Sequence, residues 1–205
     1  MTLRAAHARA LEDCLAGGGV AVFPADTVYG LACMPDDTGA VARLYALKGR
    51  APDKPAAVLF FALEPALAAL PELGARTRAA VAALLPGALT LLVPNPAHRF
   101  ALACGPDPVT LGLRVPALPA ALRALGDVAA PVLQSSANAA GGPDARTLAE
   151  VPQAIRDGAD LVLDGGKLPG TPSTVVDLRG YEDAGTWSVV RAGAVGEDAL
   201  RAALG

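Results

Sequence analysis

Hydroxyl, amide and cationic side chains recur where the predicted strands and one predicted helix of this chain end. Arginine forks suit phosphate and carboxylate groups, and a lysine supplies a mobile point charge. Together these residue types favour a site that holds polyanions over one that cleaves bonds with a nucleophilic serine. The candidate residues are Thr27, Tyr29, Lys48, Arg50, Thr110, Arg114, Ser136, Asn138, Ser173 and Arg191.

The histidines and cysteines argue against two other kinds of site. His7 and His98 are the only histidines and stand in unrelated contexts, which disfavours a zinc enzyme and a Ser-His hydrolase. The cysteines at 14, 33 and 104 are odd in number and far apart, so they fit neither a disulfide framework nor a CxxC zinc site. We predict small buried thiols and no bound metal.

Lys48 lies on the inward face of a predicted helix. It follows Val41, Leu44 and Tyr45 at helical spacing, and those three residues form the apolar stripe of the helix. A lysine in that position must snorkel to water or meet an anion. The alternative is a purely structural cation, favourably placed at the carboxyl end of a helix.

Arg114 ends a predicted strand whose residues alternate in character. The apolar residues at 109, 111 and 113 would face the core, while Thr110, Gly112 and Arg114 would share the other face. A glycine between two polar residues lets a ligand approach the backbone, and this favours a binding role for the strand. The alternative is a bulge that carries an exposed arginine.

Two further polar groups could belong to ordinary turns. Asp26 and Thr27 follow the apolar run 19–23, and Ser136 and Asn138 follow the run 130–133. Short polar residues at strand ends often do no more than hydrogen-bond to the neighbouring backbone. Their repetition at two strand ends favours a ligand role, but the residues themselves leave both interpretations open.

Apolar runs and helical spacing predict an alternation of strands and helices that would position these side chains. The predicted strands cover 19–23, 56–61, 89–93, 109–114, 130–133, 160–163, 175–178 and 187–190. The predicted helices cover 3–16, 36–48, 64–70, 76–85, 119–125, 147–157 and 199–204, with a proline-rich surface loop at 94–107. This alternation indicates the α/β class, and it predicts a basic ligand cleft at the strand ends.

Length and composition set the broad limits. A chain of 205 residues suits a single domain over 1–205. No stretch approaches the ~18 to 20 uninterrupted apolar residues of a membrane span, and the amino terminus lacks a signal-peptide core, so we expect a cytoplasmic protein without a membrane partner. The net charge of −3 disfavours a surface that binds nucleic acid everywhere, although it allows a local basic cleft.

The order of the motifs resembles one family. The stretch 24–31 reads Pro-Ala-Asp-Thr-Val-Tyr-Gly-Leu, and it is followed by Lys-Gly-Arg at 48–50 and Ser-Ala-Asn at 136–138. These motifs are similar to those of the YrdC-type threonylcarbamoyl-AMP synthases, in their short, single-domain TsaC-like form. The resemblance implies a twisted, mixed and open sheet flanked by helices. It extends over about residues 17–195, through further matches at 86–90, 113–116, 172–177 and 191–193.

The resemblance also implies a reaction and its participants. The family converts ATP, bicarbonate and L-threonine to threonylcarbamoyl-AMP and pyrophosphate, and Mg²⁺ accompanies the ATP. The carbamate of threonine attacks the α-phosphate, and the protein mainly positions the reactants and neutralises charge. The expected partners are these small molecules and, downstream, tRNA and the threonylcarbamoyl-transferase complex, which modifies the adenosine next to the anticodon.

Site residues are carried over position by position. Lys48, Arg50, Ser136 and Asn138 are the expected catalytic residues. The expected nucleotide contacts are Arg50, Lys54, Thr110, Ser136, Asn138 and Arg191. The expected threonine contacts are Thr27, Tyr29, Arg114, Gln134 and Ser173, with Arg114 suited to the carboxylate.

Two residues depart from the pattern of the family, and one other function remains open. Ala25 replaces a threonine of the opening motif, and Leu59 stands where some members have a histidine. Both departures weaken the threonine assignment. The alternative is a non-catalytic nucleotide- or RNA-binding paralogue, or a relative that handles another carbamoyl-adenylate. ATP and amino-acid binding would separate an enzyme from an RNA-binding module.

Overall fold

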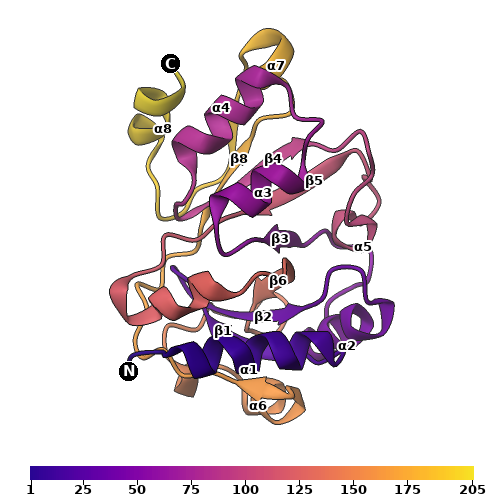
Figure 1. Ribbon diagram of the computed structural model, residues 1–205, viewed down its shortest axis with the longest axis vertical. Coiled ribbons are helices and arrows are strands. Elements are labelled where there is room, and N and C mark those ends of the chain that lie inside the picture. Colours follow the sequence, from indigo (N-terminus) through magenta and orange to yellow (C-terminus); the bar gives the residue numbers. More distant parts are fainter.

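The computed structural model describes residues 1–205, and its strands form one nine-stranded sheet in the order β7-β1-β2-β6-β3-β5-β4-β8-β9. The strands follow one another along the long axis of the molecule, from β1 near the amino terminus to β8 near the other end (Figure 1). The strands are β1 (Ala21–Pro24), β2 (Tyr29–Cys33), β3 (Ala57–Leu59), β4 (Leu89–Pro94), β5 (Thr110–Arg114), β6 (Val132–Ser136), β7 (Leu161–Val162), β8 (Thr174–Asp177) and β9 (Ser188–Arg191).

Helices flank this sheet, and α1, α3 and α4 cross in front of the strands in Figure 1. The α/β class with a mixed sheet flanked by helices is therefore confirmed. The helices are α1 (Ala5–Ala16), α2 (Thr38–Lys48), α3 (Leu63–Ala69), α4 (Ala75–Leu84), α5 (Ala101–Cys104), α6 (Gln153–Gly158), α7 (Tyr181–Ala184) and α8 (Glu197–Leu204), with short 3-10 helices η1 (Ala120–Asp127) and η2 (Leu148–Glu150). None of the helices is long and apolar enough to cross a membrane.

Helix α2 has the clearest local signals at both ends. The Asp37 carboxylate accepts a hydrogen bond of 2.9 Å from the Ala40 N–H and so caps the amino end. Gly49 ends the helix in the left-handed conformation, with φ of 59°, which glycine adopts without a steric cost. These two ends fix Lys48 as the last helical residue.

The strand directions decide where a ligand site can form. The pairs β3–β5, β4–β8 and β1–β7 are parallel, and the other neighbouring pairs are antiparallel. Antiparallel neighbours end at opposite edges of a sheet. The polar residues at the ends of successive strands therefore cannot gather at one edge, which differs from the predicted cleft at the strand ends.

The two faces of the central strands differ sharply. On β4 and β5, Leu91, Val93, Leu111 and Leu113 are completely buried and belong to the main apolar core. On the opposite face Thr90, Thr110 and Gly112 are polar or small, and Leu92 is apolar but only partly buried. This alternation matches the prediction for residues 110–114, but the prediction that Val109 faces the core is wrong, because Val109 precedes β5 and is 53% exposed.

Several elements depart from the sequence prediction. Strand β2 was missed: after the turn at 25–28 the chain reverses, and Tyr29 pairs with Pro24. The predicted helix 147–157 is divided into η2 and α6, because Pro152 cannot continue a helix and instead precedes α6. The short helices α5 and α7 lie in segments with too few residues for a periodic pattern.

Candidate functional site

A cavity of about 440 Å³ lies on the face of β4 and β5 that carries Thr90, Thr110 and Gly112, opposite the buried core residues of these strands. Residues at alternate positions of β5, namely Thr110, Gly112 and Arg114, all line it. Period-two alternation along the strands, rather than the meeting of strand ends, therefore gathers the site. A cavity of this size can hold a small-molecule ligand.

The cavity brings together some of the predicted site residues and leaves others outside. Those that line it are Arg50, Thr110, Arg114, Gln134, Ser136, Ser173 and Arg191. Those that do not line it are Thr27, Tyr29, Lys48, Lys54 and Asn138. Both predicted groups, the threonine contacts and the nucleotide contacts, are thus represented in one cavity.

Arg114 is the centre of a buried polar cluster on this cavity. Its guanidinium donates to Asp26 Oδ1 at 2.8 Å and to Gln134 Oε1 at 3.0 Å, and it lies 3.4 Å from Thr27 Oγ1. Burial raises the pKa of the Asp26 carboxyl, and the charge of Arg114 opposes that rise. The Nε of Arg114 is buried without a hydrogen-bond partner. The arginine is therefore held in place by three side-chain acceptors.

Gly30 leaves space for one member of this cluster. A Cβ atom at position 30 would lie 2.9 Å from Gln134 Nε2 and 3.0 Å from a ring carbon of Phe23. Those distances are too short for carbon contacts, so a side chain at 30 would displace Gln134 and its bond to Arg114. The absence of a side chain at Gly30 thus allows Gln134 to pack beside the cavity.

Lys48 joins the two motif segments 48–50 and 136–138. Its Nζ donates to the backbone oxygen of Ser136, to the backbone oxygen of Asn138 at 2.9 Å and to Asn138 Oδ1 at 2.8 Å. Burial, with a smaller effect of Arg50, lowers the pKa of Lys48 to about 8. The inward position predicted for Lys48 is confirmed, but the lysine meets carbonyl oxygens rather than an anion.

Arg50 and Lys54 lie on the connection between α2 and β3. Arg50 lines the cavity, donates to the backbone oxygen of Pro55 at 2.7 Å and stacks 5.9 Å from the centre of the Tyr45 ring. Its Nε is also buried without a partner. Lys54 is exposed and outside the cavity, and only its backbone is bound: its oxygen accepts from the Tyr45 hydroxyl at 2.7 Å, and its N–H donates to the Ala51 oxygen at 3.1 Å.

Ser173 connects the strands on the opposite side of β5. Its hydroxyl lies 2.8 Å from the Thr90 hydroxyl, and Arg191 donates to its backbone oxygen at 2.8 Å. Thr90 lines the cavity and was missed by the sequence reasoning. Thr90 is the one polar residue of the apolar run 89–93, and this was the signal that could have placed it on the face of the other ligand residues.

The prediction of Tyr29 as a threonine contact needs correction. Tyr29 is completely buried and does not line the cavity. Its hydroxyl lies 2.8 Å from the backbone oxygen of Gly166 and 3.0 Å from Asp164 Oδ1, and it accepts a bond of 3.0 Å from the Gly165 N–H. Tyr29 thus anchors the segment that follows β7, and its hydroxyl is already occupied.

The two departures from the family pattern lie in the core. Ala25 and Leu59 are both completely buried, and neither lines the cavity. Because neither position lines the cavity, the departures at 25 and 59 do not change the polar groups of its wall.

Charged residues beyond the prediction also line the cavity. Arg179 stands at the rim and pairs with Asp177 at 2.6 Å, and Asp107 and Asp144 contribute carboxylates. Arg179 lies just after β8, in a segment with no periodic pattern, so the alternation of polar and apolar residues could not identify it. The protein has no group of three or more His, Cys, Asp and Glu side chains that could hold a metal ion.

Fold and cavity define the class of this protein: an α/β protein whose mixed sheet carries a polar, ligand-sized cavity on one face. The family model Sua5/YciO/YrdC, described as "Telomere recombination", matches residues 13–193. The chain therefore belongs to the Sua5/YciO/YrdC family, which confirms the resemblance found in its motifs.

Curated relatives and solved structures agree with this membership. A threonylcarbamoyl-AMP synthase of Chromohalobacter salexigens is 38% identical over 170 residues, covering 80% of this chain and 89% of the relative. One of Xanthomonas campestris is 35% identical over 169 residues, with the same coverage of both chains. The crystal structure of Pyrococcus abyssi Sua5 complexed with L-threonine matches with a TM-score of 0.84 and 26% identity. The matched region covers 100% of this chain and 59% of the Sua5 chain.

Proposed function

We propose that this protein is an L-threonylcarbamoyladenylate synthase, a nucleotidyltransferase that acts on ATP, bicarbonate and L-threonine. In this reaction the threonine amine and bicarbonate form a carbamate and water. A carbamate oxygen then attacks the α-phosphorus of ATP, the bond to the β-phosphate breaks, and pyrophosphate leaves. Mg²⁺ enters with the triphosphate as part of the substrate, and the product remains a mixed anhydride with AMP.

The observation that carries this proposal is a pair of arginines in one cavity. Arg50 and Arg114 both line it. Arginine forks suit the carboxylate of an amino acid and the phosphates of a nucleotide. One belongs to the predicted nucleotide contacts and the other to the predicted threonine contacts. Two anionic groups in one cavity match an amino acid and a nucleotide.

The residues of the site divide into two roles under this proposal. Arg114 binds the threonine carboxylate, because Asp26 and Gln134 already fix its orientation on the cavity wall. Ser173 supplies a hydroxyl contact to the same amino acid, and Thr27 acts from behind through its contact with Arg114. The nucleotide contacts on the cavity wall are Arg50, Thr110, Ser136 and Arg191, with Lys48 and Asn138 acting through Ser136, which both of them bind.

The chemical contribution of the protein is positioning and charge neutralisation. No histidine lines the cavity, so proton transfer by an imidazole has no candidate. Fixed arginine donors stabilise charge that develops on the phosphate oxygens, and they need little reorganisation because they are already held. The relatives named threonylcarbamoyl-AMP synthase, and the relative crystallised with L-threonine, support this assignment.

Release of pyrophosphate tests the proposal directly. Purified protein with ATP, Mg²⁺, bicarbonate and L-threonine should release pyrophosphate, and omission of threonine or bicarbonate should stop the release. Mass spectrometry should identify threonylcarbamoyl-AMP. Protein that binds ATP but releases no threonine-dependent pyrophosphate would instead support the non-catalytic paralogue or a relative that handles another carbamoyl-adenylate.

The proposed product also assigns a cellular context. Threonylcarbamoyl-AMP would serve a transferase complex that modifies tRNA next to the anticodon, and this requires a cytoplasmic location. Deletion of the gene should abolish that modification in a cell with no second synthase. An intact modification in such a cell would remove this part of the proposal.

A further inference from the structure

The segment 95–109 forms a wall of the cavity, although its sequence suggested only a surface loop. Ala103 and Cys104 of α5, and Asp107 beyond it, all line the cavity. This wall does not belong to the sheet, so no strand pairing fixes its position. Another set of contacts must hold it.

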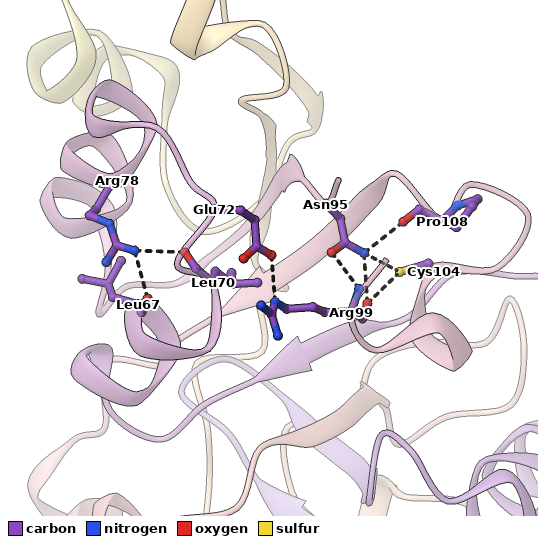
Figure 2. A network of polar contacts seen from close by, with 8 residues as sticks. All are labelled: Leu67, Leu70, Glu72, Arg78, Asn95, Arg99, Cys104 and Pro108. Atoms are coloured by element: carbon purple, nitrogen blue, oxygen red, sulfur yellow. Dashed lines mark hydrogen bonds and ion pairs between the residues drawn. The ribbon is translucent and has the colours of Figure 1, made fainter. Parts of the chain in front are cut away.

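The Asn95 side chain supplies several of these contacts, as Figure 2 shows. It is completely buried, and its Nδ2 donates to the backbone oxygens of Arg99 and Pro108, both at 2.9 Å, and lies 3.5 Å from Cys104 Sγ. Its Oδ1 accepts a bond of 3.0 Å from the Arg99 N–H. One amide group therefore joins the beginning, the middle and the end of the loop.

The loop adopts a backbone conformation that needs such support. His98 and Phe100 have φ of 51° and 52°, the only positive values outside glycine. Side chains other than glycine are strained in this region and persist there only when surrounding contacts fix them. The Arg99 residue between them is bound twice: by Asn95 at its backbone and by Glu72 Oε1 at its side chain, at 2.8 Å.

The wall is connected to the proposed nucleotide contacts. The Ala56 N–H donates to the Ala103 oxygen at 2.8 Å, and Ala56 follows Pro55, whose oxygen binds Arg50. At the other end, the Thr110 N–H donates to the Asp107 oxygen at 3.2 Å. A displacement of the loop would therefore shift the backbone beside Arg50 and Thr110.

We propose that Asn95 is a positioning residue that fixes this wall and thereby sets the affinity of the cavity for the nucleotide. Asn95 acts through Ala103 and Asp107 and does not line the cavity itself. Naming the nucleotide as the affected ligand rests on the proposed function. The role of Asn95 in holding the wall does not rest on it.

Substitution of Asn95 by aspartate tests the proposal with little change in size. Asn95→Asp replaces the two N–H donors by an oxygen that faces the Arg99 and Pro108 carbonyl oxygens. We expect the KM and the Kd for ATP to rise about tenfold, as for a small displacement of a binding wall, while kcat and the threonine KM stay within about twofold. Glu72→Gln, at the outer end of the network, should shift the same constants in the same direction by less.

Arg78 provides a matched control within the same view. It donates to the backbone oxygens of Leu67 and Leu70 at 3.1 and 2.9 Å, and no bond connects it to the 95–109 loop. Arg78→Gln should lower the melting temperature without changing the ATP constants. If folded Asn95→Asp and Glu72→Gln bind ATP like the wild type, or if Arg78→Gln shifts the ATP constants equally, the positioning role is wrong.

The thiol of Cys104 gives a readout that does not depend on the reaction. Cys104 is 3% exposed and Cys33 is completely buried, so a Cys14→Ser background leaves no readily accessible thiol. Asn95→Asp should open the wall and speed the reaction of Cys104 with an aromatic disulfide reagent about tenfold or more, by local opening. ATP should slow that reaction in the Cys14→Ser protein. An unchanged rate in Asn95→Asp would overturn the proposal even if pyrophosphate release is confirmed.

Discussion

Two arginine–aspartate pairs at the cavity have similar closest distances but opposite surroundings, and Arg114 gives Asp26 one hydrogen bond while Arg179 contacts both oxygens of Asp177. Arg114 lies 2.8 Å from Asp26, and their side chains are 5% and 3% exposed. Arg179 lies 2.6 Å from Asp177, with the arginine side chain 48% exposed. The two pairs have nearly the same N–O distance, but they differ in burial, and burial determines how firmly each arginine is held.

The buried pair is fixed before a ligand arrives, and the exposed pair can exchange partners. Breaking a buried pair leaves an uncompensated charge without water, whereas exposed charges are solvated and screened. Arg114 therefore provides a preorganised anchor for a small anionic group. Arg179, which also approaches Asp107 at 3.6 Å and Thr110 at 3.4 Å, can turn from one acceptor to another.

The largest effect should come from removing one member of the buried pair. Arg114→Met leaves Asp26 buried without its cation, and we expect a loss of about 3 to 5 kcal/mol in the free energy of unfolding. The double variant Arg114→Met/Asp26→Asn should recover most of that loss, because neither charge is then left alone. Denaturant unfolding of the two variants and the wild type measures this.

The pH dependence supplies a second check of the same pair. Burial raises the pKa of Asp26 above its ordinary value, and loss of Arg114 should raise it further. A carboxyl whose pKa is raised by folding binds its proton more tightly in the folded state, so its cost grows as pH rises. The deficit of Arg114→Met should therefore shrink in acid. A deficit that is constant from neutral to acidic pH would show that packing, and not charge, causes the loss.

Activity should respond to Arg114 in a specific way. Arg114→Lys keeps the charge but loses the fork, so it should raise the KM for threonine by about tenfold or more and change the KM for ATP less. Initial rates of pyrophosphate release with each substrate varied measure the two constants. A rise confined to the ATP constant would place Arg114 in the nucleotide site.

An intermediate effect is expected at Lys48, which is buried but paired with carbonyl groups. Lys48→Met should keep the size of the side chain and lose its bonds to Ser136 and Asn138. We expect kcat/KM for ATP to fall by about tenfold or more and the melting temperature to fall as well, because Asn138 Oδ1 and the two backbone oxygens lose a buried donor. A variant with unchanged kinetics would make Lys48 a core residue without influence on the site.

The lowered pKa of Lys48 gives this prediction a pH signature. Its pKa falls from 10.5 to about 8, so half of the Lys48 side chains are uncharged at about pH 8 and most of them are uncharged above it. Wild-type kcat/KM for ATP should decline there, and the decline should be absent in Lys48→Met. The unfolded chain holds this proton up to about pH 10.5, so the contribution of Lys48 to stability rises with pH between these two values. A stability contribution that falls in this window would contradict the assignment.

The sequence was informative about elements and less informative about where they meet. The end of a helix at Lys48 and the alternation from Thr110 to Arg114 are local patterns, and both were predicted correctly. Strand order and direction depend on long-range pairing, which no local pattern encodes. The sequence prediction therefore identified cavity residues such as Arg114 and Ser136. It placed the cavity at the strand ends, whereas the cavity lies on one face of the central strands.

The missed site residues have the same origin. Asp26 stood inside a recognised motif, but its pairing with Arg114 joins residues 88 positions apart. Arg179 and Asn95 lie in segments without periodicity, and only the fold brings them to the cavity or its wall. Conversely, Tyr29 looked available in the sequence because its partners, Asp164 and Gly166, are distant.

The smallest effect should appear at the exposed pair, and its salt dependence should separate it from the buried one. Arg179→Gln removes a pair whose cation is half exposed, so the free energy of unfolding should change by less than about 1 kcal/mol. The KM for ATP should rise about two- to fivefold at low ionic strength, and the difference should fade toward about 1 M salt, where the screening length is near 3 Å. Arg123→Gln, an exposed arginine outside the cavity, is the matched control and should leave the constant unchanged. If Arg179→Gln destabilises the protein as much as Arg114→Met, or if its effect on ATP survives high salt, then burial does not distinguish the two pairs, and the exposed arginine is held as firmly as the buried one.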